Sequence, residues 1–289
     1  MKDTVCIVQN GLRAWDDETV EKGKGRHVNR NSMTGKLKLP QVTLVAMTSV
    51  NVRATIKAMQ YSMRGIEFGD AVLITHKKPF GLPRGIRYSH TDRLSSIDDF
   101  NYKMVYELGS HIHTDFALIV HADGFVVHPE MWQDAFLDYD YIGAPWPLPP
   151  AGDTTTYRDR DGNICRVGNS AGIRSKRLMD FPKKAGIPWE GEYAYGRMWY
   201  YEDGFICCKI RHLLEAEGMR IAPLSVAKYY SHEKMIPEVQ GITPFAFHKW
   251  EGTNAQYPNF IKEPITRRMK AAVRKVKGHA LGKRLEKEG

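Results

Sequence analysis

The chain has 289 residues, 42% hydrophobic and 11% aromatic, a length and composition typical of a soluble globular protein with one large α/β domain or two small ones. It contains nothing close to ~20 consecutive apolar residues, which argues against a membrane-spanning helix, and the apolar run near its N-terminus is too short for a secretory signal, so we expect a cytoplasmic protein. Of the formal net charge of +9, residues 262–289 carry +7, through ten Lys or Arg against three Glu. The body of the protein is therefore nearly neutral and its tail is basic, which argues against a globally basic nucleic-acid-binding protein.

The first strongly patterned part of the chain predicts a βαβ unit. Residues 1–40 are weakly patterned and partly irregular, residues 42–48 and 71–75 are apolar and β-rich, and residues 54–64 have apolar side chains at helical spacing. Neither a G-x-G-x-x-G pattern nor a Walker lysine pattern follows the first strand, which disfavours a Rossmann dehydrogenase or a P-loop NTPase. A nucleotide could still bind at the strand end, held by Thr48, Ser49 and Asn51.

Residues 97–113 predict a helix that carries two histidines near its end. His111 and His113 flank Ile112, but residues two apart on a helix do not face each other, so we do not expect them to form a metal pair.

The central stretch is a short apolar run, residues 116–120, followed directly by His121, Ala122, Asp123 and Gly124. The run suits a strand that is buried on both faces, and ligands of open α/β sheets bind beyond the carboxyl ends of such strands. One interpretation is a metal or phosphate site, at which Gly124 allows a ligand to approach the backbone. The other is a strand that ends in a polar turn capped by Asp123.

The next segments predict a short helix, a long loop and a turn of small residues. Pro129 suits the first position of a helix over residues 130–137, and residues 147–162 have the composition of an irregular loop of the kind that often covers a site. Gly168, Asn169 and Ser170 offer close backbone approach and free N–H groups for an anion, or form a plain turn; a helix is expected from Ser175 onward.

Glu202 and Asp203 precede an apolar segment, residues 205–214, that predicts a helix containing the buried pair Cys207 and Cys208. The four cysteines form no C-x-x-C pair, so a zinc knuckle or a dithiol motif is not expected. The two acids suit either an N-cap and helix-dipole partner or a carboxylate that serves as general base.

The end of the chain supplies further candidates. His232 and His248 are candidate metal ligands, and residues 266–280 predict a basic amphipathic helix that lies on an anionic membrane surface. A solvated tail and a weak nucleic-acid contact are the alternatives for that helix.

Five segments in order resemble one known family: Val-Thr-Leu-Val-Ala from residue 42, Phe-Ala-Leu-Ile-Val-His-Ala-Asp-Gly-Phe from 116, Tyr-Asp-Tyr-Ile-Gly-Ala-Pro-Trp from 139, Val-Gly-Asn-Ser-Ala-Gly-Ile-Arg-Ser from 167 and Glu-Asp-Gly-Phe-Ile-Cys from 202. They resemble the DUF5672 group, whose members are expected to be glycosyltransferases similar to GT-A-fold enzymes. The resemblance implies a single α/β GT-A-like domain over residues 41–261, with a mostly parallel central sheet flanked by helices and a Rossmann-like nucleotide-binding half, and a basic C-terminal helix in residues 262–289.

The resemblance also implies roles for individual residues. In the GT-A pattern a strand ends in D-x-D, whose last Asp binds a divalent cation, Mn²⁺ or Mg²⁺, on the sugar-nucleotide diphosphate. Asp123 matches that position, His121 departs from the pattern at the first Asp, and His248 is favoured over His232 as the histidine that completes the metal site. The segment from Gly168 to Gly172 resembles the loop against the donor sugar. Asp203 is assigned as general base of an inverting transfer, with Glu202 as its support or as a donor-sugar contact.

The leading interpretation is therefore a nucleotide-sugar-dependent glycosyltransferase of bacterial surface polysaccharide or lipopolysaccharide synthesis. Its partners would be a nucleotide-sugar donor, a carbohydrate or glycolipid acceptor and, through residues 262–289, the anionic inner face of the membrane. Two alternatives stay open: a glycosyltransferase that modifies a nucleic-acid base, and a non-catalytic sugar- or nucleotide-binding protein on a degenerate GT-A fold.

Overall fold

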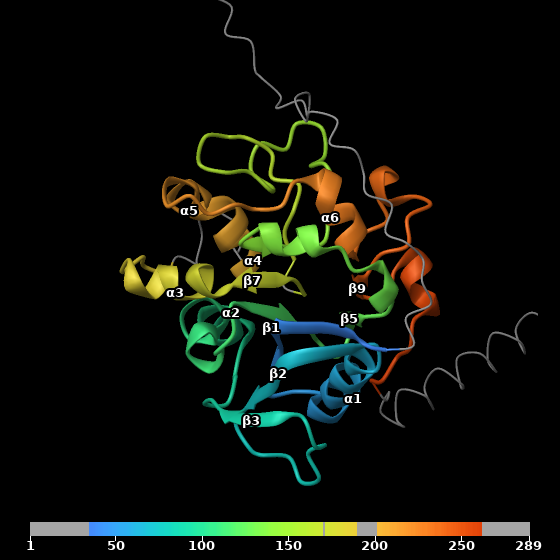
Figure 1. Ribbon diagram of the computed structural model, residues 1–289. Coiled ribbons are helices and arrows are strands. Elements are labelled where there is room, and N and C mark those ends of the chain that lie inside the picture. Colours follow the sequence, from blue (N-terminus) through green and yellow to red (C-terminus); the bar gives the residue numbers. More distant parts are fainter. Residues whose placement is uncertain (1–34, 170, 190–200, 262–289) are drawn as a thin grey trace, which may run out of the picture. The chain divides into compact units, whose positions relative to one another are not determined.

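The computed structural model describes residues 35–169, 171–189 and 201–261 (Figure 1). The elements below belong to the compact unit that begins at Lys36. The predicted basic helix at residues 266–280 lies outside the described residues. Within those residues, no helix combines the length and the apolar composition needed to cross a bilayer.

The main sheet has six strands in the order β3-β2-β1-β4-β7-β6. The first four strands in this order are parallel to one another, whereas β7 pairs antiparallel with both β4 and β6. The bounds are β1 Leu37–Met47, β2 Ile66–Thr75, β3 Arg87–His90, β4 Phe116–Ile119, β6 Tyr141–Ile142 and β7 Ile173–Ser175. The predicted α/β class with a mostly parallel sheet is confirmed, as are the three predicted strands.

Strand β1 is at the centre of the sheet and is buried on both faces, which explains its continuous apolar sequence. Because successive side chains of a strand point to opposite faces, Leu44 and Ala46 pack in the same cluster as helix α1 (Val52–Met63), and Val45 and Met47 pack in a second cluster. Helices α2 (Ile97–Tyr106) and α3 (Lys176–Lys184) contribute to this second cluster. Helices thus cover both faces of the sheet (Figure 1).

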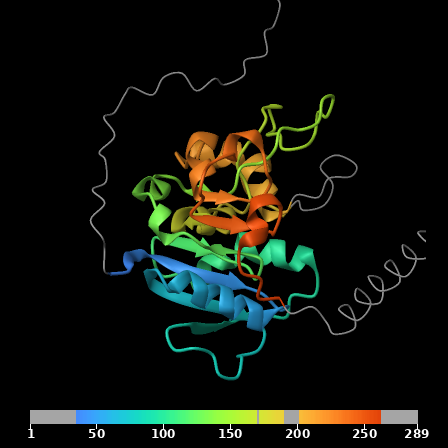
Figure 2. The same cartoon turned by 90° about the vertical axis from the view of Figure 1, so that its right-hand side faces the viewer.

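A second sheet has the order β5-β9-β8, with bounds β5 Gly124–Val126, β8 Ser231–His232 and β9 Ala246–His248. Its strands appear in green and orange in Figure 2. Phe125 packs edge-on against Tyr61 of α1, with ring centroids 5.4 Å apart. Since β4 ends at Ile119 and β5 begins at Gly124, the chain passes from the main sheet into the second sheet within a few residues.

Two of the predicted helices begin as expected. Ser96 and Asp99 form a capping box at the start of α2, and the Ser175 hydroxyl accepts a hydrogen bond from the Leu178 N–H at the start of α3. Helix α2 is shorter than predicted: it ends at Tyr106 and is followed by a 3₁₀ turn, Leu108–His111.

Two other predicted helices are not single regular α-helices. Residues 130–137 are not one helix but two 3₁₀ turns, Pro129–Met131 and Asp134–Asp138. The segment after Tyr201 consists of a short helical turn α4 (Glu202–Gly204), a π-helical turn Phe205–Lys209 and helix α5 (Arg211–Ala216). Cys207 and Cys208 are buried in that π turn, as expected. Helix α6 (Leu224–Tyr230) leads into β8, and short 3₁₀ turns Pro237–Val239 and Gly252–Gln256 complete the described chain.

Candidate functional site

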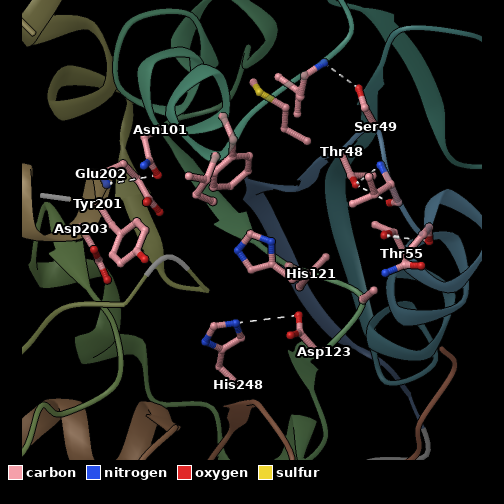
Figure 3. A pocket seen from close by; sticks show the side chains of 18 of the residues that line it. Thr48, Ser49, Thr55, Asn101, His121, Asp123, Tyr201, Glu202, Asp203 and His248 are labelled. Carbon is pink, nitrogen blue, oxygen red and sulfur yellow. Dashed lines mark hydrogen bonds and ion pairs between the residues drawn. The ribbon is translucent and has the colours of Figure 1, made fainter. Parts of the chain in front are cut away.

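A pocket of about 690 Å³ lies at the carboxyl ends of β1 and β4, where ligands of open α/β sheets bind (Figure 3). Segments that are far apart in the sequence form its walls. The predicted site residues that line it are Thr48, Ser49, Asn51, His121, Asp123, Asn169, Glu202, Asp203 and His248. Gly124 and Gly168 are not among its lining residues, and Ser170 lies outside the described residues.

Pairing of β5 with β9 brings His248 to Asp123. Gly124 is the register partner of His248, and the Lys249 N–H donates a 2.7 Å hydrogen bond to the Asp123 carbonyl. His248 Nε2 then lies 3.8 Å from Asp123 Oδ1. A Cβ atom on Gly124 would lie 2.7 Å from the His248 ring, so glycine serves here to admit the imidazole rather than a ligand.

His121 lies between the two sides of the pocket. Its ring centroid is 5.9 Å from that of Phe100 and 5.6 Å from that of His248. Burial, assisted by the neighbouring His248, lowers the pKa of His121 to about 4, so the imidazole is neutral at neutral pH. Its Nε2 atom is buried and has no hydrogen-bond partner in the described part of the chain.

These side chains fit a divalent cation only together with a ligand. Among the described residues, no three His, Cys, Asp or Glu side chains are arranged to hold a metal. Asp123 Oδ1 and His248 Nε2 are close enough for both to bind one ion, and the buried His121 Nε2 is a further nitrogen on the pocket wall. Because Mg²⁺ is usually held by one or two carboxylates together with substrate phosphates, the arrangement suits an ion completed by a phosphorylated ligand.

Asn169 connects the two halves of the site. Its backbone N–H donates to Asp203 Oδ2 at 3.0 Å, and its side-chain amide donates to Glu233 and contacts His248 Nδ1 at 2.9 Å. Its Oδ1 accepts from the Ala171 N–H at 2.9 Å. The residue is buried, with a left-handed φ of 87°. A single residue thus holds the carboxylate of Asp203 and the imidazole of His248.

We expect Asn169→Gly to lower the free energy of unfolding by about 1–3 kcal/mol, because buried groups of Glu233 and His248 lose their amide partner. Asn169→Ala should lower the free energy of unfolding by about 1 kcal/mol more than Asn169→Gly does, because the positive φ that glycine adopts freely is unfavourable for alanine. Urea denaturation of both variants measures the two effects. Equal stability of the two variants would contradict the strained backbone, and wild-type stability of Asn169→Gly would contradict the side-chain role.

The sequence analysis missed Glu233 and Lys249, which also line the pocket. Glu233 Oε1 lies 3.6 Å from His248 Nδ1 and pairs with the Lys249 ammonium. Burial alone would raise the pKa of Glu233, but His248 and Lys249 outweigh it and hold the pKa at about 2. The only signal in the sequence was their position directly after the two candidate histidines, His232 and His248.

Asp203 and Glu202 have different environments. Burial raises the pKa of the Asp203 carboxyl, even though it accepts hydrogen bonds from the Asn169 and Gly204 N–H groups at 3.0 and 2.7 Å. Glu202 is buried and forms an ion pair with Arg174, 3.3 Å away. Asp203 therefore has the properties of a proton acceptor, whereas Glu202 belongs to a buried structural pair. The N-cap position is Tyr201, so neither acid is the N-cap.

The anion cradle predicted in the small-residue turn would need free N–H groups, and three of the N–H groups of this turn are bonded within the protein. The Gly168 N–H donates to the Ala144 carbonyl, the Asn169 N–H to Asp203 and the Ala171 N–H to Asn169, so these groups are already committed within the protein. A Cβ atom on Gly168 would overlap the ring of Trp146, which explains the glycine by packing rather than by ligand approach.

The other end of the pocket holds polar groups after β1. Thr48 Oγ1 accepts from the Val50 N–H at 3.1 Å, and Ser49 Oγ accepts from the Leu94 N–H at 2.9 Å. Asn51, at the start of α1, is exposed and makes no side-chain capping bond there. The structure therefore places the three predicted nucleotide contacts together, with Asn51 facing solvent.

The remaining candidate histidines lie away from the pocket lining. His111 Nδ1 is 2.7 Å from Ser89 Oγ, His113 is exposed, and His232 Nε2 is 2.8 Å from the Lys228 carbonyl. His248 thus lines the pocket, whereas His111, His113 and His232 do not.

No curated protein matches the sequence. Several solved structures resemble the fold. An active-site mutant of LgtC is 13% identical, with 80% of this chain and 95% of that chain covered and a TM-score of 0.47, and the galactosyltransferase LgtC in complex with donor and acceptor sugar analogues is 12% identical, with coverages of 79% and 99% and a TM-score of 0.44. The mannosyltransferase PcManGT from Pyrobaculum calidifontis in complex with GDP-Man and Mn²⁺ is 12% identical, with coverages of 66% and 58% and a TM-score of 0.35. The family model described as "Protein of unknown function (DUF5672)" matches residues 86–248. Since this match spans more than half of the 289 residues, the chain belongs to the DUF5672 family.

Proposed function

We propose that the protein is a nucleotide-sugar-dependent glycosyltransferase that acts on a carbohydrate or glycolipid acceptor. The observation that carries this proposal is that the wall of one pocket holds both the Asp123–His248 pair and Asp203. Sugar transfer needs two such groups: one set that handles the charge of a leaving diphosphate, and a base that takes the proton of the acceptor hydroxyl.

In this proposal the diphosphate of the donor lies beside Asp123 and His248. A divalent cation, Mn²⁺ or Mg²⁺, held there would stabilise the negative charge that develops on the leaving group. Lys249 is a protein cation on the same wall, held by Glu233 and by its own backbone hydrogen bond to Asp123. The nucleoside would extend toward Thr48, Ser49 and Asn51, and a pocket of about 690 Å³ is within the usual size range of ligand sites.

Asp203 is the general base of the proposed reaction. An acceptor hydroxyl is a poor nucleophile, so a carboxylate must remove its proton as it attacks the sugar. The raised pKa of Asp203 brings its basicity closer to that of a working base, and the N–H groups of Asn169 and Gly204 fix its orientation. Glu202 supports this arrangement through its ion pair with Arg174.

The finer features rest on the resemblance described for the sequence. A base on one side of the sugar and a leaving group on the other suit transfer with inversion. The acceptor would be a bacterial surface polysaccharide or lipopolysaccharide precursor, made on the cytoplasmic side of the membrane, with residues 262–289 at the anionic lipid surface.

A binding panel tests the donor site. We expect one class among UDP-, GDP-, CMP- and dTDP-sugars to raise the melting temperature of the wild type in the presence of Mn²⁺ or Mg²⁺. Asp123→Ala should remove this shift, because it deletes the only carboxylate of the Asp123–His248 pair. Asp161→Ala, an exposed carboxylate of the 147–162 loop, is the matched control and should keep it. Absence of a shift with every nucleotide sugar would count against the proposed function.

A further inference from the structure

The loop between β2 and β3, residues 76–86, carries an aromatic side chain that is fully open to solvent. Phe80 is 107% exposed, and Gly81 next to it has a left-handed φ of 68° and open space within 4 Å of the position that a Cβ atom would take. Leu82 packs against the core and anchors the loop. The loop projects beyond β3 in both views (Figures 1 and 2). A phenylalanine in this position contributes nothing to the core, and its ring is open to a partner.

The same loop is basic. Lys77, Lys78 and Arg84 are exposed, and none of them forms an ion pair with a carboxylate in the described ranges. Residues 71–91 contain no Asp or Glu. Arg87 is already neutralised by Asp70, 2.7 Å away. The loop therefore carries one exposed aromatic ring and three exposed cations that have no carboxylate partner among the described residues.

The loop starts near the pocket but does not stay there. Strands β2 and β3 are parallel, so the loop leaves β2 at the end of the sheet that holds the pocket and returns to the opposite end, where β3 begins. A Cβ atom on Gly85 would accordingly lie 3.6 Å from the side chain of Met63, the last residue of α1. His76, at the start of the loop, contacts the pocket residue Ser49 at 3.1 Å.

We propose that this loop binds an anionic lipid bilayer, with Phe80 inserted at the boundary of headgroups and acyl chains and the three cations on lipid phosphates. Aromatic residues favour this boundary, and basic residues next to it are attracted by the surface potential of anionic lipids. A projecting tip with one ring suits a soft surface that closes around it.

Membrane binding by this loop requires neither the proposed reaction nor residues 262–289, so it can hold or fail independently of both.

The test is flotation of the full-length protein with phosphatidylcholine vesicles and with vesicles that also contain phosphatidylglycerol. We expect binding to the anionic vesicles only. Phe80→Ala should weaken it about tenfold, the effect of losing one well-buried apolar side chain, and Phe80→Trp should preserve it. Joint replacement of Lys77, Lys78 and Arg84 by Gln should weaken it about 100-fold at low salt, with little binding left to lose at high salt.

Leu148→Ala is the matched control. Leu148 is 60% exposed in the 147–162 loop, which lies at the opposite end of the view from the 76–86 loop in Figures 1 and 2. It should bind vesicles like the wild type, and all variants should keep the wild-type melting temperature because the altered side chains are exposed. Wild-type vesicle binding by Phe80→Ala would overturn the proposal. So would variants that lose binding to a single-stranded oligonucleotide but not to vesicles, a result that would assign the surface to nucleic acid.

Discussion

Asp203→Asn should reduce the rate of sugar transfer by about 10²–10⁴-fold and leave donor binding nearly unchanged. The amide has the shape of the carboxylate but cannot accept the proton of the acceptor hydroxyl. Its oxygen can still accept a hydrogen bond from the Asn169 or Gly204 N–H, so the loop that carries Asn169 should keep its position. The measurement is single-turnover transfer with the donor identified by the binding panel, together with the affinity for that donor.

The pH dependence of the rate provides a second readout of the same prediction. A general base must be deprotonated, so the wild-type rate should fall as the pH decreases through the pKa of Asp203. Burial raises that pKa, so the fall should occur at a higher pH than for an ordinary aspartate. The residual rate of Asp203→Asn should not show this fall with decreasing pH. Asp161→Asn, at the exposed site, is the control. Loss of donor binding in Asp203→Asn, or an unchanged rate, would refute the role of Asp203 as base.

Arg174→Met should lower the free energy of unfolding by about 3–5 kcal/mol, the largest stability effect that we expect for a single substitution near the pocket. The side chains of Arg174 and Glu202 are only 1% and 3% exposed, and their charged groups lie 3.3 Å apart. Arg174 also donates to the Met104 carbonyl at 2.9 Å, which ties the segment of Glu202 to helix α2. Methionine fills a similar volume but removes the positive charge beside a buried carboxylate.

Urea denaturation measures this effect. The double variant Arg174→Met with Glu202→Gln should recover part of the loss, because a neutral amide is less costly to bury than a carboxylate without its guanidinium. Lys184→Met, which removes a cation from an exposed ion pair with Asp180, should change stability by less than about 1 kcal/mol. A loss of similar size in Arg174→Met and Lys184→Met would show that burial of the pair has no special energetic importance.

Local sequence patterns were sufficient to predict several elements of the fold. The continuous apolar runs at residues 42–48 and 116–120 are typical of buried strands of a sheet covered on both faces, and Ser175 with its following residues has the pattern of a helix start. His121 and Asp123 follow a central strand directly, and the carboxyl end of such a strand is where pockets form. These features depend on side chains within a few residues of one another, so the sequence determined them.

Short elements were harder to predict because their local signal is weak. Residues 130–137 have a favourable Pro129 and yet form two 3₁₀ turns, since Phe136 is directed into the core among Trp132, Tyr230 and Phe245. Strands β6 and β7 have only two and three residues, too few for a period-2 pattern to be recognised. Tertiary contacts, not propensity, decided these segments.

The composition of the site was decided mainly by the tertiary structure. The register of β5 with β9 places His248 opposite Gly124, and therefore beside Asp123, although the two segments are more than 100 residues apart. The same fold brings Glu233 to Asn169 and to Lys249, and Arg174 to Glu202. Sequence alone determined which chemical groups follow the central strand, because burial and chain direction are local properties. Which distant groups meet them depends on strand pairing and packing across the whole domain, and only the folded chain fixes those.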